Sequence, residues 1–323
     1  MKALTFVDMC SGAGGLALGL ERAGFEPRLL LDEDADAYRT LKTNREHWNV
    51  LRADLLDFDP GNHQESYDVD LLSAGLPRVK SNATAARAES GQEEELLRAA
   101  VYLAHAVTPR ALLIENVPTL ADSERFRDFR EFARAELEHL GYEFSWFVLN
   151  AADFGVPQDR KQGVLVAIKK RWFPSFRPPV PTVTEHVSVG TALAPSMGAR
   201  GWRDAARWAA QATTVAPTLV GGSKNRGGAD LGPAGSKRKW EKLGVNAHSL
   251  GNEIPGADFV WAPELGKEGM VRLTVDQTAL VQSFPTDWVI TGKKTARYRQ
   301  VGHASPPPVG EALGRAVARA LRS

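Results

Sequence analysis

The chain has 323 residues, of which 40 are lysine or arginine and 39 are aspartate or glutamate. Its length predicts one large domain with a smaller one, and contents of 43% hydrophobic and 24% charged residues are ordinary for a globular protein. The single cysteine excludes an intramolecular disulfide or a cysteine zinc knuckle and suits a reducing, cytoplasmic location, and no apolar run approaches the roughly 18 residues of a membrane span.

Strand-like and helical stretches alternate through the first 170 residues. The apolar runs that predict strands are residues 4–9, 27–31, 69–73, 111–114 and 164–168, and helical spacing covers 16–23, 92–107 and 125–140. This alternation predicts the α/β class with a mostly parallel, doubly wound sheet. Such sheets hold ligands at the carboxyl ends of their strands, so the polar residues that follow each strand are the candidate site residues.

The middle of the chain has a different character. Prolines between residues 174 and 181 mark a boundary, and residues 196–245 then hold nine lysines and arginines against three acidic residues. Residues 80–150 hold eight basic and twelve acidic residues, so the neutral total conceals a basic segment beside an acidic one. Basic charge with Trp202, Trp208 and Trp240 favours a polyanion surface, and a solvated loop region is the alternative. Regular helix returns after residue 272 and ends in an amphipathic stretch over 309–321.

A glycine-rich turn follows the first strand, with the sequence Asp-Met-Cys-Ser-Gly-Ala-Gly-Gly over residues 8–15. Glycines let the backbone approach a ligand, and the helix that follows offers free N–H groups. Asp32 ends the second strand, where a carboxylate commonly binds a ribose diol, and Asp54 ends another. The pattern predicts an adenosine-containing cofactor, the alternative being a tight turn with two surface aspartates.

Further polar stretches follow along the chain. Glu115 ends the strand over 111–114, where partial desolvation of its carboxyl would suit it to donate a proton. Polar or basic blocks also occur over 154–160, 272–274, 282–285 and 298–307. Taken in order, these motifs resemble the DNA cytosine-C5 methyltransferase family over about residues 4–170 and 270–320.

The resemblance implies a Rossmann-like, S-adenosylmethionine-dependent methyltransferase sheet with a smaller target-recognition domain. Residues 1–176 would form the first part of the methyltransferase domain, 177–268 the target-recognition, DNA-binding domain, and 269–323 a segment that returns to the first. S-adenosyl-L-methionine would be the cofactor and double-stranded DNA the partner, with no metal. The positions implied for the cofactor are Phe6, Asp8, Cys10, Gly12, Gly14, Asp32, Glu33, Asp54, Leu55, Pro77, Ala304 and Ser305.

The resemblance also implies which residues contact the target cytosine of the DNA. Glu115 would contact N3 and N4 of a flipped cytosine, Asn116 would fix the neighbouring loop, and Arg160 belongs to the catalytic block. The pattern breaks after Pro77, because Arg78 stands where the family has its nucleophilic cysteine. A guanidinium group is no nucleophile, since it cannot usefully be deprotonated in a protein. The only cysteine, Cys10, lies in the cofactor turn, where packing is expected.

Two more blocks depart from the family pattern. Gln162 replaces the second arginine of the Gln-x-Arg-x-Arg block, and the family's Gly-Asn-Ala-Val is Gly-His-Ala-Ser over residues 302–305. Arg78 and Gln162 both lie at the site of the base chemistry, while the glycine turn, Asp32 and Asp54 look intact. The loop over 78–92 reads either as a mobile surface loop or as the segment that closes over a flipped base.

Residues expected to contact DNA are Arg78, Lys80, Gln162, Lys224, Arg226, Lys237, Arg238 and Lys239, the last three as a phosphate patch. The sequence leaves three hypotheses. One is a methylation-deficient member that binds DNA and S-adenosylmethionine and acts as a regulator, as a base-occluding binder or as partner of an active methyltransferase or nuclease. The second is an enzyme of altered chemistry that keeps Glu115 as a proton handler. The third is an ordinary restriction-modification or defence methyltransferase, with Arg78 a laboratory substitution or with another nucleophile.

Overall fold

The computed structural model describes residues 3–79, 87–222 and 228–323, without the side chains of 87–90. Contacts divide the chain into two units. Unit 1 comprises Met1–Leu149, Lys161–Val180 and Val309–Ser323, and unit 2 comprises Asn150–Arg160 and Pro181–Pro308. Packing thus groups residues 269–308 with unit 2, and the functional boundaries expected at 176 and 268 stay predictions.

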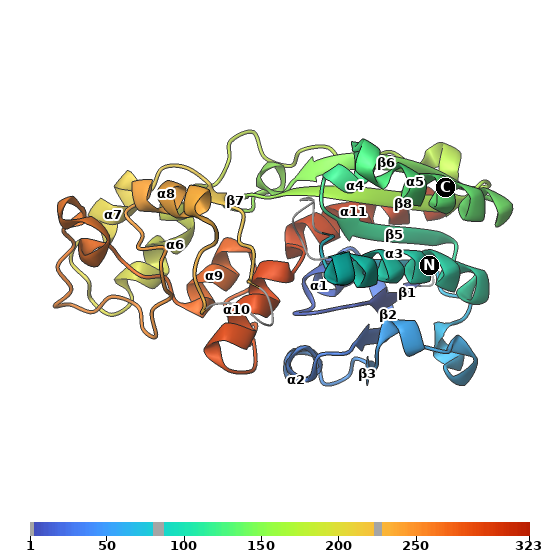
Figure 1. The fold of residues 1–323 in the computed structure, drawn as a ribbon, viewed down its shortest axis with the longest axis horizontal. Helices are drawn as coiled ribbons and strands as arrows, with labels where there is room; N and C mark the ends of the chain where they lie inside the picture. Colours follow the sequence, from blue (N-terminus) through green and yellow to red (C-terminus); the bar gives the residue numbers. More distant parts are fainter. Residues whose placement is uncertain (1–2, 80–86, 223–227) are drawn as a thin grey trace. The chain divides into compact units, whose positions relative to one another are not determined.

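Unit 1 is built on a seven-stranded sheet of order β3-β2-β1-β4-β5-β8-β6. The strands are β1 (Leu4–Met9), β2 (Phe25–Asp32), β3 (Val50–Arg52), β4 (Leu71–Gly75), β5 (Ala111–Asn116), β6 (Tyr142–Asn150) and β8 (Lys161–Lys169). The first five in spatial order pair in parallel, and β8 is antiparallel to β5. This confirms the predicted α/β fold with a parallel-dominated sheet (Figure 1). The strand order reverses at β1, which is where such sheets bind ligands.

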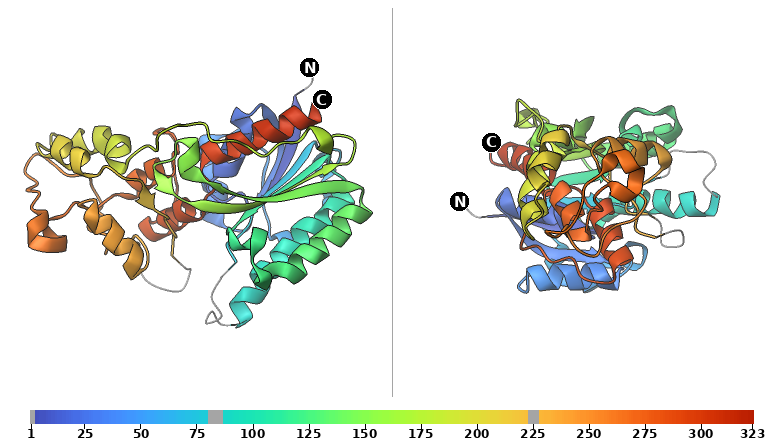
Figure 2. Two further views of the ribbon diagram at one scale, coloured as in Figure 1. Left: turned by 90° about the horizontal axis from the view of Figure 1, so that it is seen from above. Right: turned by 90° about the vertical axis from the view of Figure 1, so that its left-hand side faces the viewer.

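Helices cover both faces of this sheet. The helices of unit 1 are α1 (Gly15–Arg22), α2 (Ala35–Asn44), α3 (Arg87–Val107), α4 (Thr119–Asp122), α5 (Arg127–His139) and α11 (Pro307–Leu321), the last beginning in unit 2. Helices α3 and α5 lie on one face, and α1 with α11 lies on the other (Figure 2). Leu97 and Val101 of α3 and Leu137 of α5 join the strands in one buried apolar cluster. Within the described ranges, no helix has the length and apolar character to cross a membrane.

Unit 2 is mainly helical. Its helices are α6 (Val189–Gly198), α7 (Ala205–Gln211), α8 (Ala234–Lys242), α9 (Val275–Val281) and α10 (Lys294–His303), with two short parallel strands, β7 (Gln158–Asp159) and β9 (Ala216–Pro217). Trp208 and Trp240 are fully buried, and Trp202 is 3% exposed. Two indole N–H groups donate to backbone carbonyls, from Trp202 to Phe259 and from Trp208 to Leu243.

The expectation that these tryptophans belong to a polyanion surface is therefore wrong. Large apolar rings gain more by leaving water than by lining a basic surface, and in this unit they form the core. The basic residues around them in the sequence stay outside, so the segment that read as aperiodic and basic contains a packed helical core.

Close packing between α1 and α11 depends on two glycines of α11. A Cβ atom at Gly314 would lie 2.7 Å from Cβ of Ala23 and 3.0 Å from a methyl group of Leu20. A Cβ atom at Gly310 would lie 2.9 Å from the carbonyl oxygen of Leu16. The helices therefore meet at a distance that only residues without a side chain permit.

Gly314→Ala is expected to lower the free energy of unfolding by about 1–3 kcal/mol, because the added methyl group must push two packed helices apart. Chemical denaturation of the full chain measures the loss. Gly235→Ala is the matched control, since Gly235 also lies in a helix and its Cβ would meet nothing within 4 Å. Equal stability of the two variants would contradict the packing argument.

Candidate functional site

The turn between β1 and α1 has an unusual backbone. Cys10, Gly12 and Gly14 all adopt positive φ angles, of 54°, 53° and 82°. The N–H of Gly14 donates to the carbonyl of Ser11 over 2.8 Å, which closes the turn. A Cβ atom at Gly12 would meet nothing within 4 Å, so the space beside this backbone is open. The turn therefore leaves room for a ligand to approach its main chain.

Asp32 ties this turn to the end of β2. One carboxylate oxygen accepts the N–H of Gly12 and the other accepts the N–H of Asp34, each over 2.8 Å. Burial raises the pKa of the Asp32 carboxyl, while the two backbone hydrogen bonds act in the opposite direction. Each oxygen keeps a lone pair for a further donor, so the carboxylate is both oriented and able to bind a hydroxyl group.

Asp8 is the most deeply buried acid of the turn. Its Oδ1 atom accepts the hydroxyl of Ser73 over 2.6 Å, and its Oδ2 atom is buried without a partner among the described residues. Burial raises the pKa of Asp8 to about 7. Burial also raises the pKa of the Cys10 thiol well above its usual value, with Asp32 adding to the effect. The only cysteine is thus held as a thiol, which is a poor nucleophile.

The remaining predicted cofactor residues of unit 1 lie around or behind this edge. The N–H of Ala53 donates to the carbonyl of Asp32, which brings the ends of β2 and β3 together, and Asp54 follows directly. Its carboxylate accepts the N–H of Leu56 over 2.9 Å, and Leu55 is buried. Glu33 is exposed beside Asp32. Phe6 is different, because it is fully buried within β1 and packs edge-on against Phe25 as a core residue.

Asn116 fixes the loop that follows β4. Its amide nitrogen donates to the carbonyl of Pro77 over 3.1 Å and to that of Leu76 over 3.4 Å. Its amide oxygen accepts the N–H of Val79 over 3.0 Å. Asn116 is fully buried, so these hydrogen bonds hold the backbone on both sides of residue 78 without competition from water.

Arg78 and Glu115 form an ion pair at this point. The Nη2 atom of Arg78 lies 3.3 Å from Oε1 of Glu115. The Glu115 side chain is 3% exposed and that of Arg78 is 24% exposed, so the pair is largely withdrawn from water. The Nε–H of Arg78 is buried and has no partner among the described residues. The carboxylate therefore faces a permanent cation at the position where the resemblance expects a thiol.

In unit 2, Arg160 serves the backbone. It is fully buried and donates to the carbonyl of Leu219 over 2.9 Å and to that of His303 over 3.5 Å. Ala304 and Ser305, which were predicted to contact the cofactor, follow His303 and are buried. Gln162, predicted to face DNA, is fully buried in β8 of unit 1.

A pair of buried glutamines was not singled out from the sequence. Gln158 donates to the side chain of Gln282 over 2.9 Å and accepts the N–H of Leu219 over 2.8 Å. Gln282 in turn donates to the carbonyl of Val301 over 2.8 Å. Each glutamine lies in a polar block that the sequence analysis noted, but only the fold shows that they join segments far apart in the chain.

Apart from Arg78 and Gln162, the residues predicted to contact DNA fall into three groups. Lys80, Lys224 and Arg226 lie outside the described residues. Lys237 lies 2.7 Å from a carboxylate oxygen of Asp230, so much of its charge is neutralised within the chain. Arg238 and Lys239 are exposed on α8 and remain suitable for phosphate contact.

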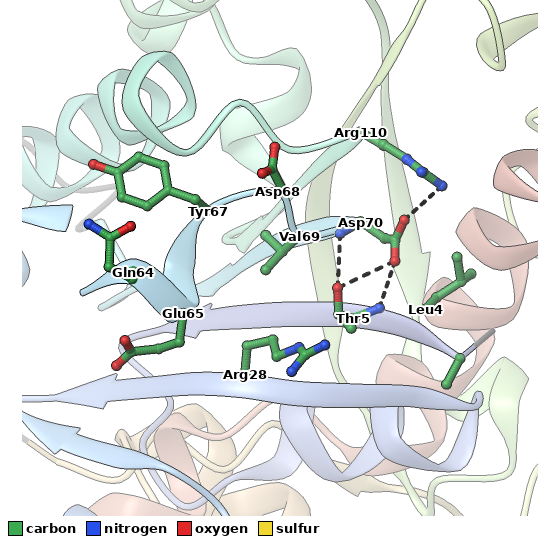
Figure 3. Close-up of a pocket in the computed structure, with 11 residues that line it drawn as sticks. Leu4, Thr5, Arg28, Gln64, Glu65, Tyr67, Asp68, Val69, Asp70 and Arg110 are labelled. Carbon is green, nitrogen blue, oxygen red and sulfur yellow. Dashed lines mark hydrogen bonds and ion pairs between the residues drawn. The ribbon is translucent and has the colours of Figure 1, made fainter. Parts of the chain in front are cut away.

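A hollow of about 430 Å³ lies at the other edge of the sheet, beside the first residues of β1 and β4. Figure 3 shows that Asp70 there accepts hydrogen bonds from Thr5 and points toward Arg110, 2.9 Å away. The predicted site residues do not line this hollow. Within unit 1 most of them gather at the carboxyl ends of the strands, so that edge is the candidate site.

Asp8 predicts a pH dependence of stability. Its folded pKa of about 7 exceeds the ordinary value of 3.8, so the folded chain keeps a proton that the unfolded chain releases. Stability from this group is therefore lost as the pH rises between these two values and stays constant above them. Asp8→Asn should remove that loss. Its free energy of unfolding relative to the wild type should therefore increase by about 2–3 kcal/mol as the pH rises from about 5 to 8.

Urea unfolding of the wild type and of Asp8→Asn at about pH 5 and at about pH 8 measures this difference in stability. Asp287→Asn is the control, because Asp287 is exposed. An Asp8→Asn variant whose stability follows the wild type in parallel across this range would show that Asp8 is ionised normally.

Comparison with known proteins places this geometry in a family. The family description "C-5 cytosine-specific DNA methylase" matches residues 4–319. The type II methyltransferase M.NaeI of Lentzea aerocolonigenes is 41% identical over 99% of this chain and 76% of its own. M.NgoMIV of Neisseria gonorrhoeae is 37% identical over 98% of each chain.

Solved structures agree at the level of the fold. The methyltransferase EhMeth of Entamoeba histolytica has a TM-score of 0.68 at 12% identity and covers 100% of both chains. The Dnmt2 methyltransferase of S. pombe has a TM-score of 0.66 at 15% identity and covers 99% of this chain and 100% of its own. The full-length family match and the two close relatives establish that this chain belongs to the C-5 cytosine-specific DNA methylase family.

Proposed function

We propose that this chain binds double-stranded DNA and S-adenosyl-L-methionine without methylating cytosine, and acts as a regulator or as partner of an active methyltransferase or nuclease. The observation that carries the proposal is Arg78, which follows Pro77 at the family's nucleophile position and forms an ion pair with Glu115. The family resemblance supplies the DNA and the cofactor, and this pair supplies the reason for inactivity.

Methylation at C5 needs a nucleophile at C6, because only the resulting adduct makes C5 reactive enough to take a methyl group. A guanidinium group cannot serve, since it stays protonated. Cys10 does not replace the missing thiolate, because burial raises its pKa and its place is in the cofactor turn. Loss of a nucleophile removes several orders of magnitude in rate.

The residues of the turn fit S-adenosyl-L-methionine, the cofactor of the family. The backbone at Gly12 is open to close approach, and the oriented Asp32 carboxylate can accept hydroxyl groups of a ribose. Asp54 at the neighbouring strand end is suited to the adenine edge. The cofactor would supply an activated methyl group, and these residues bind and orient it.

An active methyltransferase of a restriction-modification system is the second candidate. The type II methyltransferases M.NaeI and M.NgoMIV are similar to this chain along its length. The buried Glu115, the loop held by Asn116 and the open backbone at Gly12 favour this reading, because these parts of the site keep residues suited to their roles. Altered chemistry would then use Glu115 as a proton handler.

Methyl transfer from labelled cofactor separates the two candidates. We expect no label on mixed duplex DNA or RNA from the wild type. Arg78→Cys should form an adduct that survives denaturation on DNA in which 5-fluorocytosine replaces cytosine, because the fluorine at C5 blocks release of the enzyme. Arg78→Ser is the control of similar size and poor nucleophilicity. Cytosine methylation by the wild type would show that the proposal is wrong.

Salt dependence tests the DNA contacts of α8. Binding to phosphates releases counterions, so the logarithm of the affinity should fall with the logarithm of salt concentration by about one unit per contact. Replacing both Arg238 and Lys239 by alanine should lower that slope by about two units, as measured by fluorescence anisotropy on a random duplex. Arg127→Ala, at an arginine of α5 that is 61% exposed, is the control. A wild-type Kd that does not change with salt would contradict a DNA role.

A further inference from the structure

We propose that the Arg78 guanidinium is an internal ligand of Glu115 that takes the place of cytosine, so that this chain binds duplex DNA without turning a base out of the helix. The second half of this inference rests on the proposed DNA binding. The first half concerns only residues of unit 1 and stands on the contacts between them.

The ion pair leaves little of Glu115 for another partner. The carboxylate is 3% exposed, and a guanidinium nitrogen lies 3.3 Å from its Oε1 atom. The Nε–H of Arg78, buried and unpaired among the described residues, is a second donor on the same planar group. A buried donor without a partner is costly, so a small movement that brings this N–H to the carboxylate would strengthen the pair.

The chemistry of the two ligands is alike. Cytosine with a proton on N3 presents N3–H and one N4–H from a planar N–C–N group, and a carboxylate accepts both. Guanidinium presents two N–H donors from the same planar N–C–N arrangement. Cytosine must take up a proton to reach this state, whereas the arginine side chain is always charged. Arg78 therefore presents Glu115 with the same pair of donors as protonated cytosine, without the need to take up a proton.

The loop makes the competition intramolecular. Asn116 holds the carbonyl of Pro77 and the N–H of Val79, and these flank residue 78. Glu115 is the neighbour of Asn116 on β5, so one strand end fixes both partners. A ligand held in this way acts at a high effective concentration. A flipped cytosine would have to compete with that concentration to reach Glu115. Base flipping also costs the energy of unstacking and unpairing, and here Glu115 cannot offset that cost.

The test removes the internal ligand and supplies it from solution. Methylguanidinium is the probe, and its binding is measured by ligand-observed NMR and by the shift in Tm. We expect Arg78→Ala to bind it and to gain thermal stability, with at least a tenfold weaker response from the wild type and from Arg78→Ala combined with Glu115→Gln. Arg78→Ser replaces Arg78→Ala if the latter does not fold, and Arg127→Ala is the matched control.

Specificity gives a second readout. Arg78→Ala should bind deoxycytidine 5′-monophosphate more tightly than thymidine 5′-monophosphate, because thymine lacks the donor pair, while the wild type should bind both equally weakly. Equal binding of methylguanidinium by wild type and Arg78→Ala, or no binding by a folded variant, would overturn the inference. Duplex binding by the wild type is measured separately, so loss of DNA binding alone would overturn the proposed function and leave the competition at Glu115 intact.

Discussion

The reversal of strand order at β1 is the constraint on which the candidate site depends. Because β1 lies between β2 and β4, the chain leaves the sheet in opposite directions on its two sides, and the carboxyl ends of the five parallel strands lie along one edge. Asp8, Asp32 and Glu115 each stand at or near such an end. Residues far apart in the sequence become neighbours by topology, and hydrogen bonds such as that between Gly12 and Asp32 then fix their orientation.

The loop after β4 shows how one scaffold can hold different kinds of side chain against the same carboxylate. The hydrogen bonds from Asn116 would hold any residue at position 78 close to Glu115, whether cysteine or arginine. The same preorganisation that positions a nucleophile thus positions a cation against a buried carboxylate. Truncation of Arg78 would leave that carboxylate buried and uncompensated, which gives the arginine a structural role of its own.

Much of this could be predicted from sequence, and the failures have physical causes. Residues 4–9 form β1 as predicted, since all six are buried and a short apolar run marks such a strand clearly. The edge strand β6 was not predicted, because its side chains are mostly half exposed and lack a clean pattern. The burial of Trp208 and Trp240 was missed because composition cannot tell a core ring from a surface one. The pairing of Lys237 with Asp230 depends on a turn, and local spacing does not reveal it.

The glycine contacts between α1 and α11 have a consequence for how the chain is made. Leu20 and Gly314 lie nearly the full length of the chain apart, yet their contact closes one face of unit 1. The sheet emerges from the ribosome with that face only partly covered by α1, and α11 is added only after unit 2 has been synthesised. Contacts of such long range slow folding and leave apolar surface exposed in the meantime. A nascent chain that stalls before α11 would therefore be prone to aggregate, whatever the state of its ligand site.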